Sequence, residues 1–434
     1  MTAPNRTPLV LRNRAFGAVW LGQVLTQAAV RMFQVGVAWW LVAYAVNGGR
    51  GLASGLFMAV STLPAVALAP LVARAVARFA HRSVLRTAAA AAGAAMAALA
   101  AWASAGDLPL AAAYAATLAL STCQAFFDPC LTTSVPELVE DADIEAATGF
   151  ELSTQSLAGL GGAFLGALIA DRAGITGLAT GCALAYLCAA ALIAPVRFRT
   201  AQAPGEAADG EPERHTLRGI LSGLPFVTRI LVCFTAANLF TTAVFVVIPL
   251  YTKSVLGDGG STVSLLEASL GTGTLIGSFT GARVAADRRP TTVGACCLAA
   301  MAAALAAPGL VTGRWVFAGG LVVAGWCVGT IGVRFVALFQ RLVPAADKPG
   351  FFAVMQAVLG ASFPLASLLF GMLGDHLSAR TLCLVQAAGL LPAACVLALL
   401  RVPDADGAQD AEDAEDAIES AAGPAAAEPV GAKR

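Results

Sequence analysis

Long apolar stretches recur along the whole chain, and they restrict its fold more than any other feature. Each is about 18 residues or longer, which is enough for a helix to cross a hydrocarbon layer of about 30 Å. Only 12% of the 434 residues are charged, whereas soluble domains carry about 25%. Strands of a membrane barrel would instead alternate apolar and polar residues over segments of about ten residues. The sequence therefore predicts an all-α integral membrane protein.

Breaks at Gly, Pro and charged residues divide the apolar sequence into twelve expected transmembrane helices, arranged as two six-helix bundles. We expect an N-terminal arm over 1–14, a first bundle over 15–196, a cytoplasmic linker over 197–222, a second bundle over 223–401 and an acidic tail over 402–434. The tail is rich in Asp, Glu and Ala and is expected to be disordered because it cannot bury a core. The expected helices lie near 15–46, 51–73, 84–104, 109–131, 145–170, 175–196, 226–253, 262–286, 291–312, 315–340, 350–373 and 380–401.

The basic residues predict how these helices are oriented. With the amino terminus inside, most of the 27 Lys and Arg residues fall on the same side of the membrane as the two termini. Cytoplasmic loops carry such an excess, so both termini are expected in the cytoplasm. The excess of Ala, and of Arg over Lys, indicates a GC-rich bacterial genome and hence a bacterial plasma membrane. The basic residues expected on the other side are Arg50, Arg172, Lys253, Arg314 and Arg380.

The two halves of the chain also resemble each other. Pairs of similar segments recur at an offset of about 205 to 210 residues, which indicates a six-plus-six duplication with the substrate site where the halves meet. The paired segments are Gly48-Gly49 with Gly259-Gly260, Arg74 and Arg78 with Arg283 and Asp287, and Asp171-Arg172 with Asp375-His376.

Short motifs add a resemblance to a known family. They are Arg12-Asn13-Arg14-Ala15-Phe16 followed by Trp20-Leu21-Gly22-Gln23, Phe127-Asp128-Pro129 followed by Val135-Pro136-Glu137-Leu138-Val139, Ile248-Pro249-Leu250-Tyr251, and Phe339-Gln340-Arg341-Leu342-Val343-Pro344. In order and spacing, over residues 11–401, the chain resembles the major facilitator superfamily. More narrowly it resembles the drug:proton antiporter branch, which includes macrolide-efflux and enterobactin-export permeases. The resemblance implies alternating access and proton-coupled export of a small amphipathic molecule.

The sequence departs from the family pattern in the loop after the second helix and in the fifth helix. Ala77 stands where the family has the Asp that helps to lock the cytoplasmic gate, and Ala163 replaces a Pro in the fifth helix. All replacements in the fifth helix are small, so close helix packing can persist. We expect the cytoplasmic gate to be formed by Arg78, Arg82, Asp128, Asp287 and Arg288.

Polar side chains on the first, fourth, seventh and tenth helices converge on the expected cavity. Arg31 lies on one helical stripe with three Gln residues, and a buried Arg in a membrane helix normally faces a wet cavity. Single Gln and Thr residues could instead only bond between helices. Two basic groups suggest a neutral or partly anionic cargo. The expected cavity residues are Gln23, Gln27, Arg31, Gln34, Thr117, Ser121, Gln124, Asn238, Thr242 and Arg334.

Proton coupling requires a titratable group that is exposed to each side in turn. The candidates are Glu151 on the fifth helix and Glu267 on the eighth helix. Glu151 is the first choice because it shares a stripe with Thr148 and Gln155, whereas Glu267 lies nearer the outer surface, where it could simply be solvated.

Other functions leave no pattern in the sequence. No GxxxxGK[ST] motif is present, the three His residues fall in expected loops, and none of the ten Cys residues forms a CxxC pair. We therefore expect no enzyme activity, no cofactor, no metal site and no nucleic-acid partner. The expected partners are a small-molecule substrate, protons and the lipid bilayer, for a chain acting as a monomer. Two alternatives remain open: a transporter-fold sensor or partner-binding protein without flux, and an importer of a small organic solute.

Overall fold

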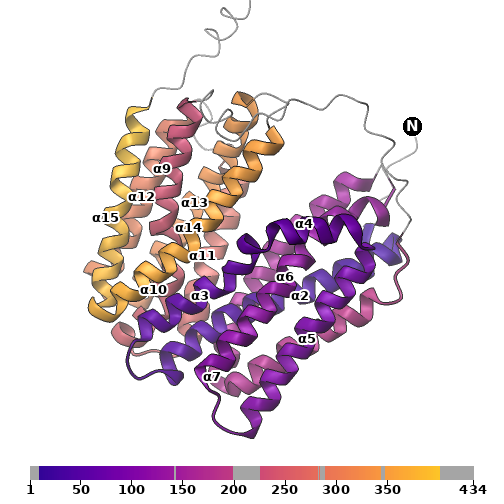
Figure 1. Cartoon of the computed structure of the whole chain (residues 1–434). Helices are drawn as coiled ribbons and strands as arrows, with labels where there is room; N and C mark the ends of the chain where they lie inside the picture. The colour runs from indigo at the N-terminus through magenta and orange to yellow at the C-terminus, as the bar shows by residue number, and fades with distance from the viewer. Residues whose placement is uncertain are drawn as a thin grey trace, which may run out of the picture.

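The structure is a computed structural model that describes residues 9–140, 143–198, 225–281, 283, 289–343 and 348–400. Within this part of the chain every regular element is helical, and the helices form two bundles (Figure 1). The first bundle contains α1 to α7 and the second contains α9 to α15. The expected all-α architecture of two bundles is confirmed, whereas most of the expected linker and the acidic tail lie outside the described residues.

The first bundle begins with a short helix inside the expected N-terminal arm. Asn13 caps the next helix, because its Oδ1 accepts hydrogen bonds from the backbone N–H groups of Ala15 and Phe16, both at 3.1 Å. The expected second helix is broken at Leu68, just before Pro70, which cannot continue a helical hydrogen-bond ladder. The elements are α1 (Leu9–Arg12), α2 (Arg14–Trp40), the π-helical turn η1 (Leu41–Ala45), α3 (Arg50–Ala67), α4 (Ala69–Arg78), α5 (His81–Ala105), α6 (Leu110–Leu138) and α7 (Ile144–Ile193).

One glycine divides α7 into the two helices expected at this place. Gly174 has φ 64° and ψ −171°, a backbone conformation that residues with a Cβ rarely adopt. In the second bundle only Ala243 separates α9 from α10, and its backbone stays in the right-handed helical region (φ −58°, ψ −19°). The elements of the second bundle are α9 (Pro225–Thr242), α10 (Val244–Tyr251), the π-helical turn η3 (Thr252–Leu256), α11 (Gly260–Thr280), α12 (Pro290–Leu310), α13 (Arg314–Leu342), α14 (Lys348–His376) and α15 (Ala379–Leu399).

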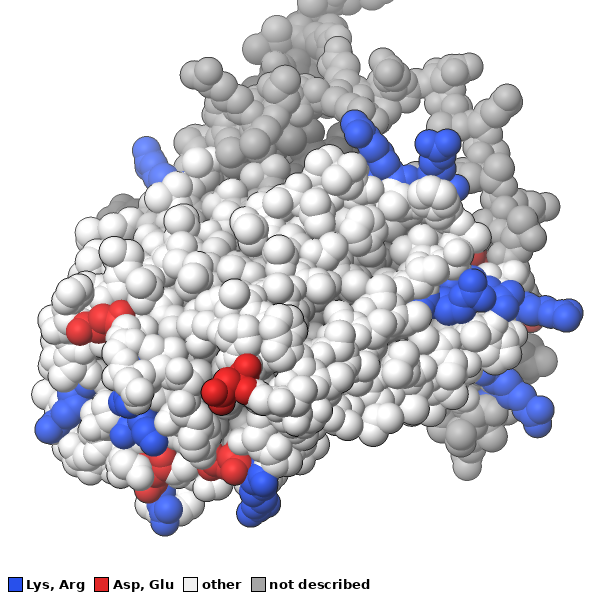
Figure 2. Space-filling model, turned by 60° about the horizontal axis from the view of Figure 1, so that its bottom comes forward, with Lys and Arg blue, Asp and Glu red and all other residues white. Residues whose placement is uncertain are grey.

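Ten helical segments in the described part of the chain are long and apolar enough to cross a membrane. One of them, Leu157–Ile193, contains the break at Gly174 and so covers two of the expected crossings. The remaining expected crossing is α11, which is not among the ten because Gly, Ser, Thr and Glu interrupt its apolar residues. On the side shown in Figure 2, most charged side chains lie toward the left and right ends, with a broad uncharged surface between them, as expected for a surface in contact with lipid.

The two bundles meet at one end and diverge toward the other (Figure 1). We call the end that carries Leu9 and Leu400 the terminal face, and the opposite end, which carries the α2–α3, α5–α6 and α14–α15 connections, the distal face. The main helix contacts between the bundles are α3 with α14 and α7 with α11. Both involve the ends of these helices at the distal face, where an added Cβ at Gly51 or Gly260 would collide with the backbone of the other bundle.

The apolar core follows the same division. One cluster of buried residues runs through both bundles and includes Phe57 and Leu120 from the first and Leu266 and Phe370 from the second. A separate cluster, which includes Phe127, belongs to the first bundle alone and lies toward the terminal face. The bundles therefore share a core near the distal face, and the first bundle has a core of its own near the terminal face.

Candidate functional site

A cavity with a volume of about 1010 Å³ is lined by residues of the first bundle. It extends from Val30 and Gln34, near the middle of α2, to His81 and Glu137 at the terminal face. Small apolar residues of α3 and α4 line one wall, and polar residues of α6 line another. The polar lining consists of Gln34, Ser61, His81, Ser121, Gln124, Asp128, Thr133 and Glu137. A cavity with one apolar wall and one polar wall is suited to an amphipathic molecule.

Asp128 is the centre of a hydrogen-bond network in this cavity. Its Oδ1 accepts hydrogen bonds from Gln27 Nε2, at 2.9 Å, and from Gln124 Nε2. Gln124 Oε1 in turn accepts a hydrogen bond of 3.3 Å from the hydroxyl of Tyr186, a buried residue in the second half of α7. The network therefore joins α2, α6 and α7, and it fixes a carboxylate in the cavity wall.

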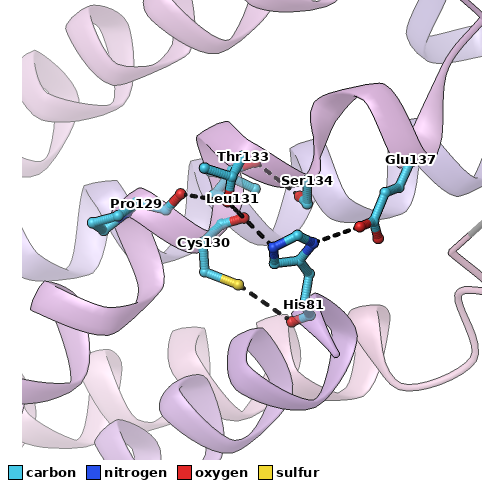
Figure 3. Close-up of polar contacts among 7 residues, drawn as sticks. All are labelled: His81, Pro129, Cys130, Leu131, Thr133, Ser134 and Glu137. Carbon is cyan, nitrogen blue, oxygen red and sulfur yellow. Dashed lines mark hydrogen bonds and ion pairs between the residues drawn. The ribbon is translucent and has the colours of Figure 1, made fainter. Parts of the chain in front are cut away.

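A second polar group lies where the cavity reaches the terminal face (Figure 3). His81 Nδ1 is 2.7 Å from Glu137 Oε1, and His81 Nε2 is 3.5 Å from the hydroxyl of Thr133. The Cys130 thiol donates to the backbone oxygen of His81 at 3.4 Å. These contacts attach the start of α5 to the last turns of α6.

Arg31 and Glu267 line a smaller cavity of about 230 Å³ between the bundles. Arg31 projects from α2 of the first bundle, and its NH1 donates to Gln34 Oε1 at 3.3 Å. Glu267 projects from α11 of the second bundle and is only 7% exposed. In the described part of the chain no hydrogen bond or ion pair to Glu267 is found, and the positive charge of Arg31 acts on its carboxylate. The expected cavity residue and the expected proton site are thus brought together across the interface.

The expected residues of the second bundle are placed differently. Asn238 Nδ2 donates to the Leu359 carbonyl at 3.1 Å and to Ser362 Oγ at 2.7 Å, and Asn238 lines a separate, mainly apolar cavity of about 300 Å³. The Thr242 hydroxyl donates to the Asn238 carbonyl at 2.7 Å. Arg334 Nε donates to the Gly281 carbonyl at 3.0 Å, just after the last turn of α11. Arg334 therefore caps a helix in its own bundle.

The remaining expected residues are spread over the first bundle. Gln23 is buried, at 2% exposure, and the buried Thr117 hydroxyl donates to the Ala113 carbonyl in the preceding turn. Ser121 lines the large cavity and donates to the Thr117 carbonyl. The side chain of Glu151 lies outside the described residues.

Three of the residues expected to form a gate are described by the structure, and these three have different surroundings. Arg78 is exposed at the end of α4, and Arg82 NH2 donates to the Ala194 carbonyl just after α7. Asp128 lies instead in the Gln27–Gln124 network. Asp287 and Arg288 lie outside the described residues.

Comparison with family models decides the family of this chain. The model of the Major Facilitator Superfamily matches residues 19–293 and 230–429, which together cover most of the chain. The chain belongs to the Major Facilitator Superfamily. It is a multi-pass membrane protein of a transporter family, with the fold of a transporter rather than of an enzyme. A search of curated proteins finds no match.

Solved structures of other transporters share the superfamily fold. The D-xylose-proton symporter aligns with a TM-score of 0.68 and 14% identity, covering 90% of this chain and 97% of the symporter. A bacterial homologue of the iron transporter ferroportin, in an inward-facing state, aligns with a TM-score of 0.67 and 14% identity, covering 88% and 98%. A mutant of the nucleoside transporter NupG aligns with a TM-score of 0.65 and 12% identity, covering 88% and 98%.

Several polar contacts of this superfamily member were missed by sequence reasoning. The pairing of His81 with Glu137 joins residues 56 positions apart, and no spacing rule indicates it. Tyr186 lies in a mainly apolar stretch of α7, and no pattern in the sequence indicates its contact with Gln124. Asp171 and Asp375 had one available signal, because they occupy equivalent positions in the internal repeat. The repeat indicates a duplication, but it does not by itself say what the two carboxylates contact.

Proposed function

We propose that this protein is a secondary active transporter of the plasma membrane, which exports a small amphipathic molecule by alternating access and couples export to protons. The cargo class is a drug, a siderophore or a secondary metabolite. In this proposal the terminal face lies in the cytoplasm, because the excess of Arg and Lys residues belongs to that side. The exporter resembles the drug:proton antiporter branch through its short motifs.

One observation carries the proposal. The cavity of about 1010 Å³ reaches the terminal face, whereas the two bundles are in contact at the distal face. An exporter needs such an arrangement when it takes up cargo from the cytoplasm. The ferroportin homologue with the same fold is described as inward-facing, which agrees with this assignment.

Glu267 is our candidate for the proton carrier. It is buried between the bundles and faces Arg31, so a change in the charge of Glu267 changes the attraction between the two bundles. Movement of the bundles would in turn change which side of the membrane can supply the proton. Glu151 remains a second candidate on the basis of its sequence position alone.

The charge of the cargo follows from the groups that line the two cavities. Two basic groups, Arg31 and Arg334, suggested a neutral or partly anionic cargo. Arg334 donates to the Gly281 carbonyl at the end of α11, so we no longer count it among the groups that attract the cargo. Arg31 and Asp128 remain, one of each sign, in neighbouring cavities. We therefore propose an amphipathic cargo with both a polar and an apolar part, without a requirement for net negative charge.

Reconstitution into liposomes with an internal pH-sensitive dye tests the proposal. Candidate compounds of the three cargo classes are added while a pH gradient is imposed across the membrane. We expect at least one compound to accumulate against its gradient, and a protonophore to abolish this accumulation. Glu267→Gln should lose accumulation but retain exchange of cargo, because glutamine cannot carry a proton. The matched control is Asp107→Asn, an exposed carboxylate in the α5–α6 connection.

The same assay separates the alternatives. An importer, such as the D-xylose-proton symporter with the same fold, would move cargo together with protons instead of against them. A sensor would bind a compound without any accumulation in either direction. Unchanged accumulation by Glu267→Gln would refute the assignment of proton coupling to this residue.

A further inference from the structure

Two carboxylates occupy equivalent places at the distal face, where the bundles touch. Asp375 lies in the last turn of α14 and accepts hydrogen bonds from the first turn of α3: Gly51 N–H at 2.8 Å and Leu52 N–H at 3.1 Å. Asp171, at the end of the first half of α7, accepts a hydrogen bond from Gly260 N–H in the first turn of α11. In both cases the carboxylate belongs to one bundle and the helix N-terminus to the other.

The physical effect of such a contact depends on the conformation. The first N–H groups of a helix have no partner within the helix, and the N-terminus carries a partial positive charge. A carboxylate placed there satisfies N–H groups and is attracted by that charge. When the bundles separate at this face, both carboxylates must leave these N-termini. The contacts therefore favour the closed distal face and oppose its opening.

Small residues make these contacts possible. An added Cβ at Gly51 would collide with the carbonyl oxygen of Gly371, and one at Gly371 would lie 2.7 Å from the Gly51 carbonyl oxygen. At the other contact, a Cβ at Gly260 would collide with the Ala167 carbonyl oxygen. The backbones of the two bundles thus touch directly at both places, which brings each carboxylate within hydrogen-bond distance.

The two contacts differ in how firmly the carboxylate is held. Asp171 Oδ1 also accepts hydrogen bonds from Trp39 Nε1 at 2.6 Å and from the Tyr44 hydroxyl at 2.7 Å. Trp39 lies at the end of α2 and Tyr44 in the following turn η1, both in the same bundle as Asp171, so these hydrogen bonds orient Asp171 before the bundles meet. The hydrogen bonds found for Asp375 all come from backbone N–H groups of α3. Asp171 should therefore contribute more to closure than Asp375 does.

We propose that Asp171 and Asp375 are paired positioning residues that lock the distal face of this transporter in its closed state. The inference rests on the alternating-access part of the proposed function, and it assigns the residues that set the balance between the two conformations. It also gives a role to the sequence repeat, since the Asp of one half meets the Gly-containing segment of the other half. Gly259-Gly260 meets Asp171, and Asp375 meets the segment that follows Gly49.

The test measures the opening of the distal face directly. Spin labels are attached to cysteines introduced at Asp107 in the first bundle and Thr312 in the second, in a full-length chain whose native cysteines are replaced. Pulsed electron resonance then gives the distribution of distances between the labels. We expect one dominant short distance for the parent chain.

Asp171→Asn and Asp375→Asn should each add a longer distance between the labels, raising the ratio of open to closed molecules about 3- to 10-fold. The effect should be larger for Asp171→Asn and largest for the double variant.

Two further variants make the result decisive. Asp258→Asn removes a carboxylate at the same face whose contact, with Thr262, stays within one bundle, and it should leave the distances unchanged. Gly371→Ala places a methyl group between α3 and α14 and should open the face without altering either carboxylate. If Gly371→Ala opens the face while the double Asp→Asn variant does not, helix packing alone holds it closed and the inference is wrong.

Failure of the proposed lock can be distinguished from failure of the proposed transport function. The distance measurement needs no cargo, so a shift in the Asp→Asn variants supports the lock even if no compound is transported. Normal transport together with unchanged distances in the double variant would refute the lock and leave the transport proposal intact. If an Asp→Asn variant fails to insert into the membrane, the Asp→Glu variant at the same position is measured instead. It keeps the negative charge and should give the parent distances.

Discussion

The two bundles share one architecture but offer different surfaces to a cargo. The cavity in the first bundle has a volume of about 1010 Å³ and contains Asp128, His81 and Glu137. The cavity in the second bundle has a volume of about 300 Å³ and is lined mainly by Phe, Leu, Met and Val. Among the described residues, the polar cavity lining therefore belongs to the first half and the mainly apolar lining to the second. Substitutions in the two halves should therefore have different consequences.

The largest effect is expected at the centre of the polar network. Asp128→Ala removes the acceptor of Gln27 and Gln124 and leaves both amides without this partner. We expect a 10- to 100-fold loss of cargo affinity, equivalent to about 1.4–2.8 kcal/mol. Binding measured by isothermal titration checks this, and Asn238→Ala is the matched substitution in the second bundle. An equal loss for both variants would contradict the division between the bundles.

A change of stability rather than of transport is expected for Arg334→Ala. The substitution removes the guanidinium that donates to the Gly281 carbonyl at the end of α11. A hydrogen bond from a charged donor contributes about 1.5–3 kcal/mol, so thermal unfolding in detergent should begin several degrees lower. The rate of transport at low temperature should stay near that of the parent. A large loss of cargo affinity at unchanged stability would contradict this prediction and would show that Arg334 contacts the cargo.

A smaller effect is expected for Tyr186→Phe. The variant keeps the buried ring and loses only the hydroxyl that donates to Gln124 Oε1. A single neutral hydrogen bond contributes about 0.5–1.5 kcal/mol, which corresponds to a 2- to 10-fold decrease in cargo affinity if the network orients Asp128. Unchanged affinity would show that Gln124 keeps its orientation without Tyr186.

The smallest effect is expected in the apolar cavity. Gly332 lines this cavity and an added Cβ would meet open space, so Gly332→Leu should fold normally while it fills part of the volume. We expect bulky cargo to bind about 2- to 5-fold more weakly and small cargo to bind unchanged, because one methylene group in such a pocket is worth about 0.8 kcal/mol. Competition binding with a series of compounds of increasing size provides the measurement.

The helices themselves were predictable, because long apolar runs and breaking residues are local properties of the sequence. The division of α7 at Gly174 agrees with the expected boundary between 145–170 and 175–196. The break at Leu68 was not expected, since the apolar run continues past Pro70. The convergence of Arg31 and Glu267 was also not expected, because it depends on how one bundle lies against the other. The contact of Asp128 with Gln27 was missed for the same reason, since the two residues lie 101 positions apart.

The polar character of α11 has a consequence for how this chain is assembled. Lipid alone would hold this segment weakly, because Ser, Thr, Gly and Glu make its insertion as a separate helix less favourable. Its neighbours α13 and α7 cover it in the finished molecule, but α13 is synthesised later. We therefore expect α11 to stay in contact with α7 or with the translocon until α12 and α13 have been synthesised.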